Sequence, residues 1–163
     1  MHIFVIVINT DIMQSIEIHR CDSTNTDFQN LIKLLDAELD ERYGNLQKQY
    51  DMYNKIEFLE TVVVAYNENI PVGCGCFKRA DDLNVEMKRI FVRSNCRGKG
   101  IASALLNELE RWAKENGSLY SILETGSKQH EAINLYKKKG YEITDNFGQY
   151  IGNTNSICMK KEL

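Results

Sequence analysis

The alternation of strand-like and helix-like patterns along this chain predicts one mixed α/β domain, in which a sheet is flanked by helices. Its length of 163 residues suits a single domain. A composition of 43% hydrophobic and 26% charged residues is typical of a globular chain with a sizeable core. No linker, repeat or low-complexity tract interrupts the alternation.

Residues 1–12 are interpreted as an N-terminal extension, and residues 13–163 as the domain itself. The run from Ile3 to Ile8 is apolar and lacks a cationic start, and it is too short for a signal peptide or a membrane span. Residues 15–20 then alternate in polarity like a first strand, directly after Met13. Three alternatives stay open for the extension: an extra edge strand, a contact in a homodimer, or an upstream start codon.

A first helix is expected to begin at an N-cap formed by Thr24 or Asp27. Its apolar residues recur at helical spacing: Phe28, Leu31, Leu35 and Leu39. A second helix is expected after Gly44. The runs 61–66 and 70–77, joined by the turn 67–69, predict a hairpin of buried strands.

The second half of the chain continues the alternation. A strand at 84–92 precedes a helix at 99–115, whose Ile101, Leu105, Leu109 and Trp112 form a buried side. We expect a strand at 118–123, then a helix at 128–139 with Ser127 as its cap and Gly140 as its end. Two final strands are expected at 141–143 and 156–160.

Charge and cysteine content narrow the classes of partner and compartment. The formal charge of −3, with no basic run longer than Lys137–Lys139, gives no reason to expect a nucleic acid partner. No membrane partner is expected either. Five cysteines without a Cys-x-x-Cys spacing predict a reducing, cytoplasmic location with neither disulfides nor structural zinc. Cys74 and Cys76 should lie buried on the same face of one strand.

A Gly-x-Gly turn lies between the strand that ends at Val92 and the next helix. Glycine tolerates positive φ and has no Cβ, so an anion could reach the backbone N–H groups around Gly98 and Gly100. The start of the helix adds its dipole and its unpaired N–H groups, which suits a pyrophosphate. Arg97 and Lys99 add positive charge. No third glycine follows in the dinucleotide-binding spacing, which argues against a doubly wound fold. A plain tight turn is the alternative.

Together with a second motif, this turn resembles the GNAT superfamily of N-acetyltransferases. The family's phosphate turn is Gln/Arg-x-x-Gly-x-Gly/Ala, and here Asn95 occupies its first position. The second motif resembles the family signature Ala-x-x-Leu-Tyr-x-x-x-Gly-Phe/Tyr through Ala132, Leu135, Tyr136, Gly140 and Tyr141. The likeness runs from about Met13 to the C-terminus, and its specific part is confined to residues 83–141. It implies an α/β (α+β) fold with a mixed, mostly antiparallel central sheet flanked by helices.

The resemblance also implies an enzyme that transfers an acetyl group from acetyl-CoA to an amine of a small molecule or peptide. The amine would attack the thioester directly, through a tetrahedral intermediate, with coenzyme A as co-substrate and no metal. Backbone N–H groups of Phe91 or Arg93 could hold the thioester oxygen. The residues expected to bind the coenzyme are Ile90, Phe91, Val92, Arg97, Gly98, Lys99, Gly100, Ile101, Ala102, Gln129 and Asn134.

Two side chains are candidates for the proton transfers. Glu86 matches an acidic residue that serves as general base in some family members; the alternative is an ion pair with Lys88 or Arg89. Tyr136 matches the family tyrosine that faces the coenzyme sulfur and could act as a mild acid, whereas the alternative is a helix tyrosine packed on the sheet. His130 lies in the first turn of its helix and should be exposed.

The acceptor site is the part of the chain that the motifs describe least. By resemblance it would include Arg42, Tyr43, Tyr50, Asp51 and Tyr53, and the loop 146–155. An Arg42 that met a substrate carboxylate would favour a small acidic acceptor such as an amino acid. Two other functions stay open: a non-catalytic coenzyme A-binding sensor or regulatory module, and a partner-binding protein built on the same scaffold.

Overall fold

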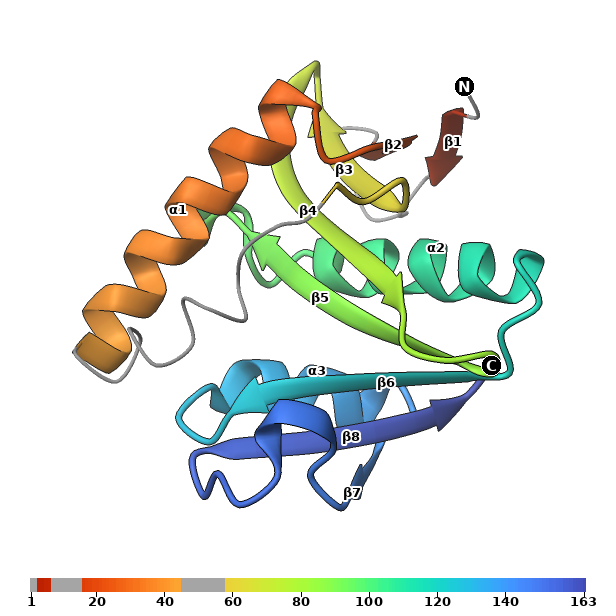
Figure 1. The fold of residues 1–163 in the computed structure, drawn as a ribbon. Helices are drawn as coiled ribbons and strands as arrows, with labels where there is room; N and C mark the ends of the chain where they lie inside the picture. The colour runs from red at the N-terminus through yellow and green to blue at the C-terminus, as the bar shows by residue number, and fades with distance from the viewer. Residues whose placement is uncertain (1–2, 7–15, 45–57) are drawn as a thin grey trace.

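The computed structural model describes residues 3–6, 16–44 and 58–163, and the statements below concern these residues. They form an eight-stranded sheet with the strand order β1-β2-β3-β4-β5-β6-β8-β7 (Figure 1). Only β5 and β6 pair in parallel; the other neighbouring pairs are antiparallel. The expected mixed, mostly antiparallel sheet is therefore confirmed. The strands are β1 Ile3–Ile6, β2 Ile16–Cys21, β3 Val62–Asn67, β4 Ile70–Arg79, β5 Asn84–Val92, β6 Tyr120–Gly126, β7 Glu142–Thr144 and β8 Ser156–Glu162.

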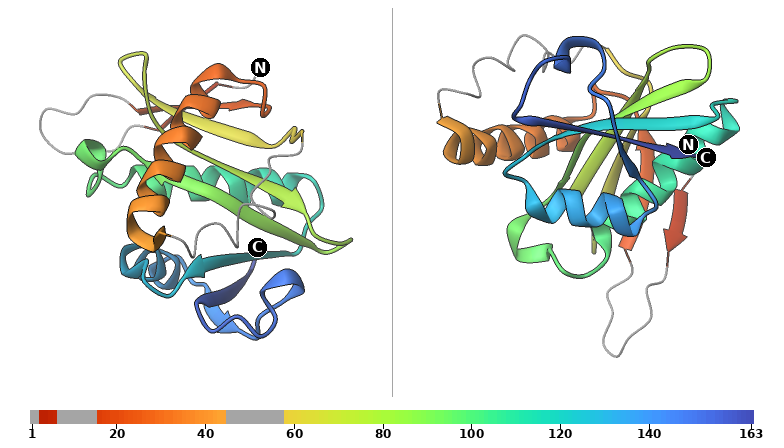
Figure 2. Two further views of the ribbon diagram at one scale, coloured as in Figure 1. Left: turned by 60° about the vertical axis from the view of Figure 1, so that its left-hand side comes forward. Right: turned by 90° about the horizontal axis from the view of Figure 1, so that it is seen from below.

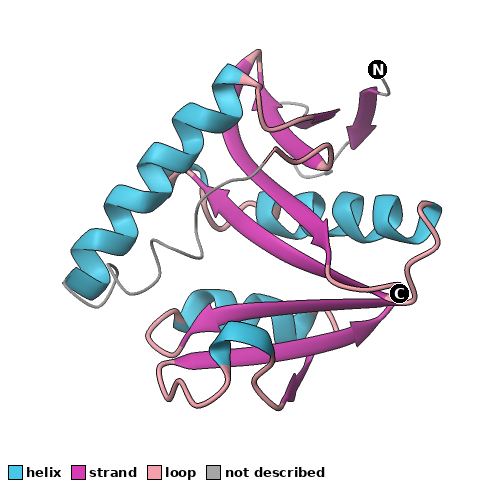
Figure 3. Ribbon diagram, in the orientation of Figure 1, coloured by secondary structure: helices cyan, strands magenta, loops and turns pink. Residues whose placement is uncertain are grey.

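Helices cover both faces of the sheet (Figures 2 and 3). The helical elements are α1 Thr26–Tyr43, α2 Ile101–Glu115 and α3 His130–Lys138, with short 3₁₀ turns η2 Ser94–Cys96 and η3 Gly148–Tyr150. One apolar cluster joins α2 and α3 to the sheet, and a second cluster joins α1 to the other face. Cys74 and Cys76 are both buried in the second cluster, as predicted. Among the described helices, none has the length and apolar character that a membrane span requires.

The hairpin and the central strand agree with the patterns that predicted them. β3 and β4 are joined by Glu68 and Asn69, both at positive φ, which is the geometry of a two-residue hairpin turn. β5 covers the predicted residues. In α2 the predicted residues Ile101, Leu105 and Leu109 are fully or almost fully buried. A Cβ at Gly73 of β4 would lie 2.8 Å from the carbonyl oxygen of Phe91, so this close strand contact requires glycine.

The cap of α1 is Asn25, not Thr24 or Asp27. The Asn25 side chain accepts a hydrogen bond from the N–H of Phe28 (2.9 Å). Asp22 accepts hydrogen bonds from both the N–H and the hydroxyl of Thr24, which engages that residue in a turn before the helix. Asp27 instead accepts a hydrogen bond from Tyr66 (2.8 Å). The predicted second helix after Gly44 falls outside the described residues.

The start of α3 also differs from the prediction. The helix begins at His130, because residues 126–129 form a turn closed by the hydrogen bond from Gln129 N–H to the Gly126 carbonyl (2.9 Å). Ser127 is therefore not a cap; its N–H donates to Asn155 in the neighbouring loop. The preceding strand β6 is shifted accordingly, from the expected 118–123 to Tyr120–Gly126.

The end of α3 explains the spacing of the second motif. Gly140 has a φ of +87°, and its N–H donates to the Lys137 carbonyl, while the N–H of Tyr141 donates to the Tyr136 carbonyl. These two bonds form a Schellman cap, in which glycine is favoured at the left-handed position. The rings of Tyr136 and Tyr141 pack edge to face with centroids 5.7 Å apart. The cap thereby fixes Tyr136 against the sheet.

The extension contributes β1, which pairs antiparallel with β2 at the edge of the sheet. Of the three interpretations of residues 1–12, this register corresponds to the edge strand. The division of the chain at residue 13 stays a prediction.

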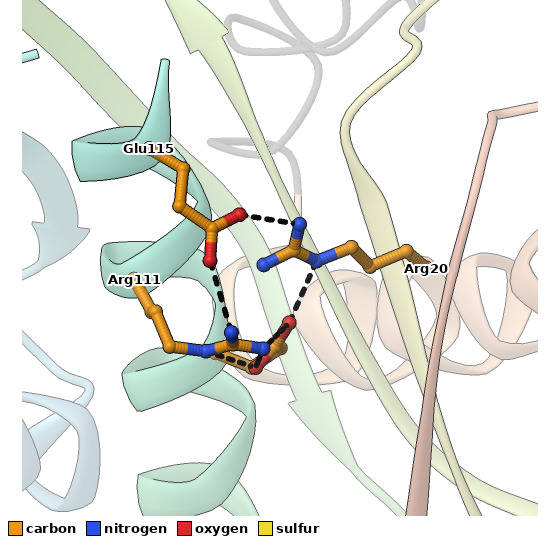
Figure 4. Close-up of polar contacts among 4 residues, drawn as sticks. Arg20, Arg111 and Glu115 are labelled. Carbon is orange, nitrogen blue, oxygen red and sulfur yellow. Dashed lines mark hydrogen bonds and ion pairs between the residues drawn. The ribbon is translucent and has the colours of Figure 1, made fainter. Parts of the chain in front are cut away.

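A network of four charged side chains ties β2 to α2 (Figure 4). Arg20 of β2 donates to Glu108 and to Glu115 on α2, with both distances 2.7 Å. Arg111 binds the same two carboxylates, at 2.6 and 2.9 Å. Glu108 is only 3% exposed, so its charge depends on these two guanidinium groups. The network fixes the position of α2, which is the helix that follows the glycine turn.

Candidate active site

β5 and β6 diverge at the centre of the sheet (Figure 1). Their parallel pairing runs from Asn84 and Tyr120 to Met87 and Leu123 and goes no further. Just beyond, the register between β4 and β5 shifts, and Arg89 has a φ of +59°. A β-bulge at this place bends β5 away from β6. The divergence leaves a groove on the side of α2 and α3 and a cavity on the side of α1.

The groove has a volume of about 400 Å³ and runs from the glycine turn to Tyr136. Of the residues expected to bind a coenzyme, all but Lys99 line it: Ile90, Phe91, Val92, Arg97, Gly98, Gly100, Ile101, Ala102, Gln129 and Asn134. Lys99 is exposed and is not among the lining residues, because the turn directs that position to solvent. The expectation that Lys99 binds the coenzyme stays a prediction.

The open end of the groove is rich in backbone donors. Gly98 and Gly100 have φ values of +75° and +79°. The first hydrogen bond of α2 runs from Ala104 to Gly100, and Gly100 provides no side-chain cap, so the N–H groups of residues 101–103 lack intrahelical acceptors. A Cβ at Gly98 would meet no atom within 4 Å. Unpaired donors at a helix N-terminus beside open space fit a pyrophosphate group.

Three ion pairs connect α1 to the walls of the groove and the cavity. Asp36 binds Arg89 at the bulge (2.5 Å), and Arg42 binds Glu131 on α3 (2.5 Å). Glu38 binds Arg97 of the glycine turn (2.6 Å). The carboxylate of Glu38 therefore neutralises the cation that was expected to meet a phosphate. Arg42 is engaged in the same way, so the small acidic acceptor that Arg42 would favour gains no support.

The cavity adjoins the groove and has a volume of about 120 Å³. Apolar side chains of α1 form one wall, and residues of β5, β6, α3 with its preceding turn, and η3 form the remainder. The residues that matter for chemistry are Glu86, Lys88, Glu124, Tyr136 and Tyr150, while Leu35, Leu39 and Tyr43 form the α1 wall. The cavity and the groove share four lining residues, so the two spaces meet beside them: Leu35, Ile90, Gln129 and Tyr136.

Glu86 lies in this cavity and forms the ion pair with Lys88 that one of its two interpretations expected, while its role as a general base stays a prediction. Its side chain binds the ammonium groups of Lys88 (3.3 Å) and Lys78 (3.6 Å). The Tyr150 hydroxyl donates to the same carboxylate (3.2 Å). Burial and the carboxylates of Glu86 and Glu124 raise the pKa of the Tyr150 hydroxyl, which therefore stays protonated and able to donate.

Glu124 is a second carboxylate on the same face of the sheet. The parallel register places Glu86 beside Ile122, and side chains two residues apart on a strand share a face. Among the residues that the structure describes, no lysine or arginine nitrogen lies within 4 Å of the Glu124 carboxylate. Burial raises the pKa of Glu124, although a hydrogen bond from Ser156 and the positive charge of Lys88 oppose the shift.

Tyr136 is 7% exposed, as expected of a helix tyrosine that packs against the sheet. Burial, followed by the nearby Glu124 carboxylate, raises the pKa of its hydroxyl. The phenol is thus protonated at neutral pH and can donate a hydrogen bond into the space between β5 and β6.

Other predicted residues fall outside the centre of the site. His130 is exposed, as expected. The N–H of Arg93 donates to the Val72 carbonyl (2.9 Å) and is not available to a thioester oxygen. Tyr50, Asp51 and Tyr53 lie outside the described residues. Sequence reasoning missed Glu124, which could have been found from the strand parity of β6 once its pairing with β5 was known.

Comparison with known proteins supports the class of the site. The sequence profile of the Acetyltransferase (GNAT) family matches residues 28–141. The IAA acetyltransferase of Azospirillum brasilense is 32% identical over 143 residues, which cover 83% of this chain and 92% of that protein.

Two solved structures share the fold. One, from Klebsiella pneumoniae, is described as a candidate acyl-CoA N-acyltransferase; it has a TM-score of 0.75 and 28% identity, and covers 90% of this chain and 96% of its own. The other is a GNAT family acetyltransferase from Elizabethkingia anophelis with acetyl-CoA bound, with a TM-score of 0.65 and 23% identity; the match covers 91% of this chain and 98% of that chain.

The fold and the glycine turn define an acyltransferase of the N-acetyltransferase class. This chain belongs to the GNAT family.

Proposed function

We propose that this chain transfers the acetyl group of acetyl-CoA to a primary amine, with the coenzyme in the groove and the amine in the cavity. The observation that carries the proposal is the meeting of the two spaces at Tyr136, between the diverging strands β5 and β6. A groove for the donor and a cavity for the acceptor that adjoin beside Tyr136 would bring the reacting groups together.

The residues of the groove fit coenzyme A. The unpaired N–H groups of residues 101–103 would bind the pyrophosphate, and the apolar side chains of Ile90, Phe91 and Val92 would contact the pantetheine arm. When bound, acetyl-CoA supplies the acetyl group as a thioester with a thiolate leaving group. The N–H of Phe91 stays the candidate for holding the thioester oxygen.

Glu124 is the group that we propose to accept the proton of the acceptor ammonium. Burial brings the pKa of Glu124 closer to that of an amine. Among the described residues, no cation forms an ion pair with the Glu124 carboxylate. Glu86 is less suited, because two ammonium groups and the Tyr150 hydroxyl already bind its carboxylate. We assign Glu86 the role of holding Tyr150 and Lys88 in the cavity wall.

Tyr136 is proposed as the donor to the departing sulfur. Two protons leave the acceptor ammonium during the reaction. One is balanced by the proton that Tyr136 gives to the leaving thiolate and later regains, and the other passes from Glu124 to solvent. Because a thiolate near pKa 8.5 is already a fair leaving group, this donation should modulate the rate without being indispensable.

The experiment that tests the proposed function is a screen for coenzyme A release from acetyl-CoA with peptides, polyamines, amino acids and aminoglycosides. Release above the rate in water alone, together with an acetylated product, supports the transferase. Binding of coenzyme A without release to any amine would favour the sensor or regulatory module instead. Failure to bind coenzyme A would favour a partner-binding protein.

A further inference from the structure

We propose that the acceptor is a primary amine on an unbranched alkyl chain that carries no carboxylate near the amine. The inference rests on the proposed acetyl transfer and concerns the class of molecule that the cavity accepts. It follows from where the cavity's charges lie and which of them already have partners.

The cations that line the cavity are already bound to carboxylates of the chain. Lys88 binds Glu86, and its nitrogen also lies 3.5 Å from the Tyr150 hydroxyl. Arg89 has only 8% of its side chain exposed and binds Asp36 at 2.5 Å. A carboxylate on the acceptor would have to displace one of these protein carboxylates from its partner.

The anionic side of the cavity differs, because Glu124 has no cation within 4 Å among the described residues. Its carboxylate adjoins Tyr136, where the groove begins. The charge of Lys88 acts on Glu124 without an ion-pair contact, so an ammonium group would give the carboxylate the direct partner that the described residues do not supply. The rings of Tyr43 and Tyr150 also line the cavity and favour a cation.

The rest of the acceptor would lie along an apolar surface. Leu35 and Leu39 project from α1 into the cavity, whose volume of about 120 Å³ suits a thin chain better than a branched one. If the amine is at Glu124, a carboxylate a few bonds away would lie against these leucines. An unpaired anion is costly in such a place, because it loses its water and gains no cation.

Three amines of matched length test the inference: butylamine, 1,4-diaminobutane and 4-aminobutyrate. We expect kcat/KM for 4-aminobutyrate to be at least about tenfold below that for butylamine, because its carboxylate would be buried without a partner. The diamine should equal or exceed butylamine. Coenzyme A release and the acetylated amine are both measured with the full-length protein.

A substitution in the cavity wall adds a test that compares the ratio of kcat/KM for two amines and does not depend on the absolute rates. Leu39→Lys adds a cation to the apolar wall and should narrow the gap between 4-aminobutyrate and butylamine by at least about threefold. The matched control is Leu34→Lys on the same helix, where Leu34 is 42% exposed and lines neither space; the ratio should not change.

Two outcomes would overturn the inference. One is turnover of 4-aminobutyrate as fast as butylamine, and the other is no coenzyme A release with any of the three. In either case the proposed function survives if other amines of the wider screen are acetylated. The proposed function itself fails if no amine in that wider screen releases coenzyme A.

Discussion

Replacing Glu124 by glutamine should abolish most of the turnover while leaving the fold intact. Glutamine keeps the shape of the side chain and removes its ability to take a proton. General-base catalysis commonly contributes about 10²- to 10⁴-fold, so kcat should fall by that factor. The affinity for coenzyme A should change little, because Glu124 lines the cavity and is not among the residues that line the groove.

The same substitution should leave the stability of the fold unchanged or raise it, although it lowers turnover. Burial raises the pKa of Glu124 in the folded protein, so the folded state binds this proton more tightly than the unfolded state. The ionised carboxylate therefore costs stability, and this cost appears as the pH rises through the folded-state pKa. Glu124→Gln removes the cost, and at pH 7 its melting temperature should equal or exceed that of the wild type.

Glu86→Gln is the matched control, since it changes the same group on the same face of the sheet. It leaves Lys78 and Lys88 without their carboxylate and should lower stability by about 1–3 kcal/mol, while kcat falls by less than about tenfold. The assays are thermal unfolding and the pH dependence of kcat/KM. As the pH falls, the wild type should lose activity at a pH above the usual pKa range of a glutamate. The pH profile of Glu124→Gln should lack this acidic decline. The reverse pattern, with turnover lost in Glu86→Gln and kept in Glu124→Gln, would refute the assignment.

Four further changes test other parts of the site. Tyr136→Phe should lower kcat most at low pH and least near pH 9, where the thiolate leaves unprotonated; a pH-independent defect would remove Tyr136 from the chemistry. Gly98→Val forces a branched residue to a φ of +75° and should abolish the thermal shift with coenzyme A while the protein stays folded; an unchanged shift would place the phosphates elsewhere. Glu38→Gln frees Arg97 and should tighten coenzyme A binding several-fold in a titration at low salt; weaker binding would mean that the ion pair holds the turn in place. Glu108→Ala removes one of the two carboxylates that bind Arg20 and Arg111 and leaves them Glu115, so it should cost about 1–3 kcal/mol in chemical unfolding; a loss below about 0.5 kcal/mol would show that Glu115 and solvent replace the lost pairs.

Local patterns predicted most of the fold. Strand and helix periods identified the β3–β4 hairpin, β5 and the buried side of α2, because these elements bury one continuous apolar face. Boundaries were less predictable. At the start of α1 several capping residues stand in a row, and the choice of Asn25 depends on Asp22 engaging Thr24. At Ser127 the neighbouring loop competes for the backbone N–H.

The site, like the fold, could be predicted from the sequence only in part. The glycine turn and Tyr136 belong to contiguous motifs, so the turn could be proposed from its place between a strand and a helix, and Tyr136 from the resemblance to the family signature. Glu124 could not, because its proximity to Glu86 arises from the parallel pairing of two strands separated by a helix. The pairing of Glu38 with Arg97 joins residues 59 positions apart, and no local pattern encodes such a contact.

The most direct test of the central claim is a crystal structure of the protein with coenzyme A. The account predicts the pyrophosphate at the N–H groups of residues 98–103 and the sulfur between β5 and β6, within hydrogen-bond reach of the Tyr136 hydroxyl. It further predicts that Glu124 lies on the far side of that sulfur, open to the cavity. A pyrophosphate bound elsewhere, or a sulfur remote from Tyr136, would contradict it.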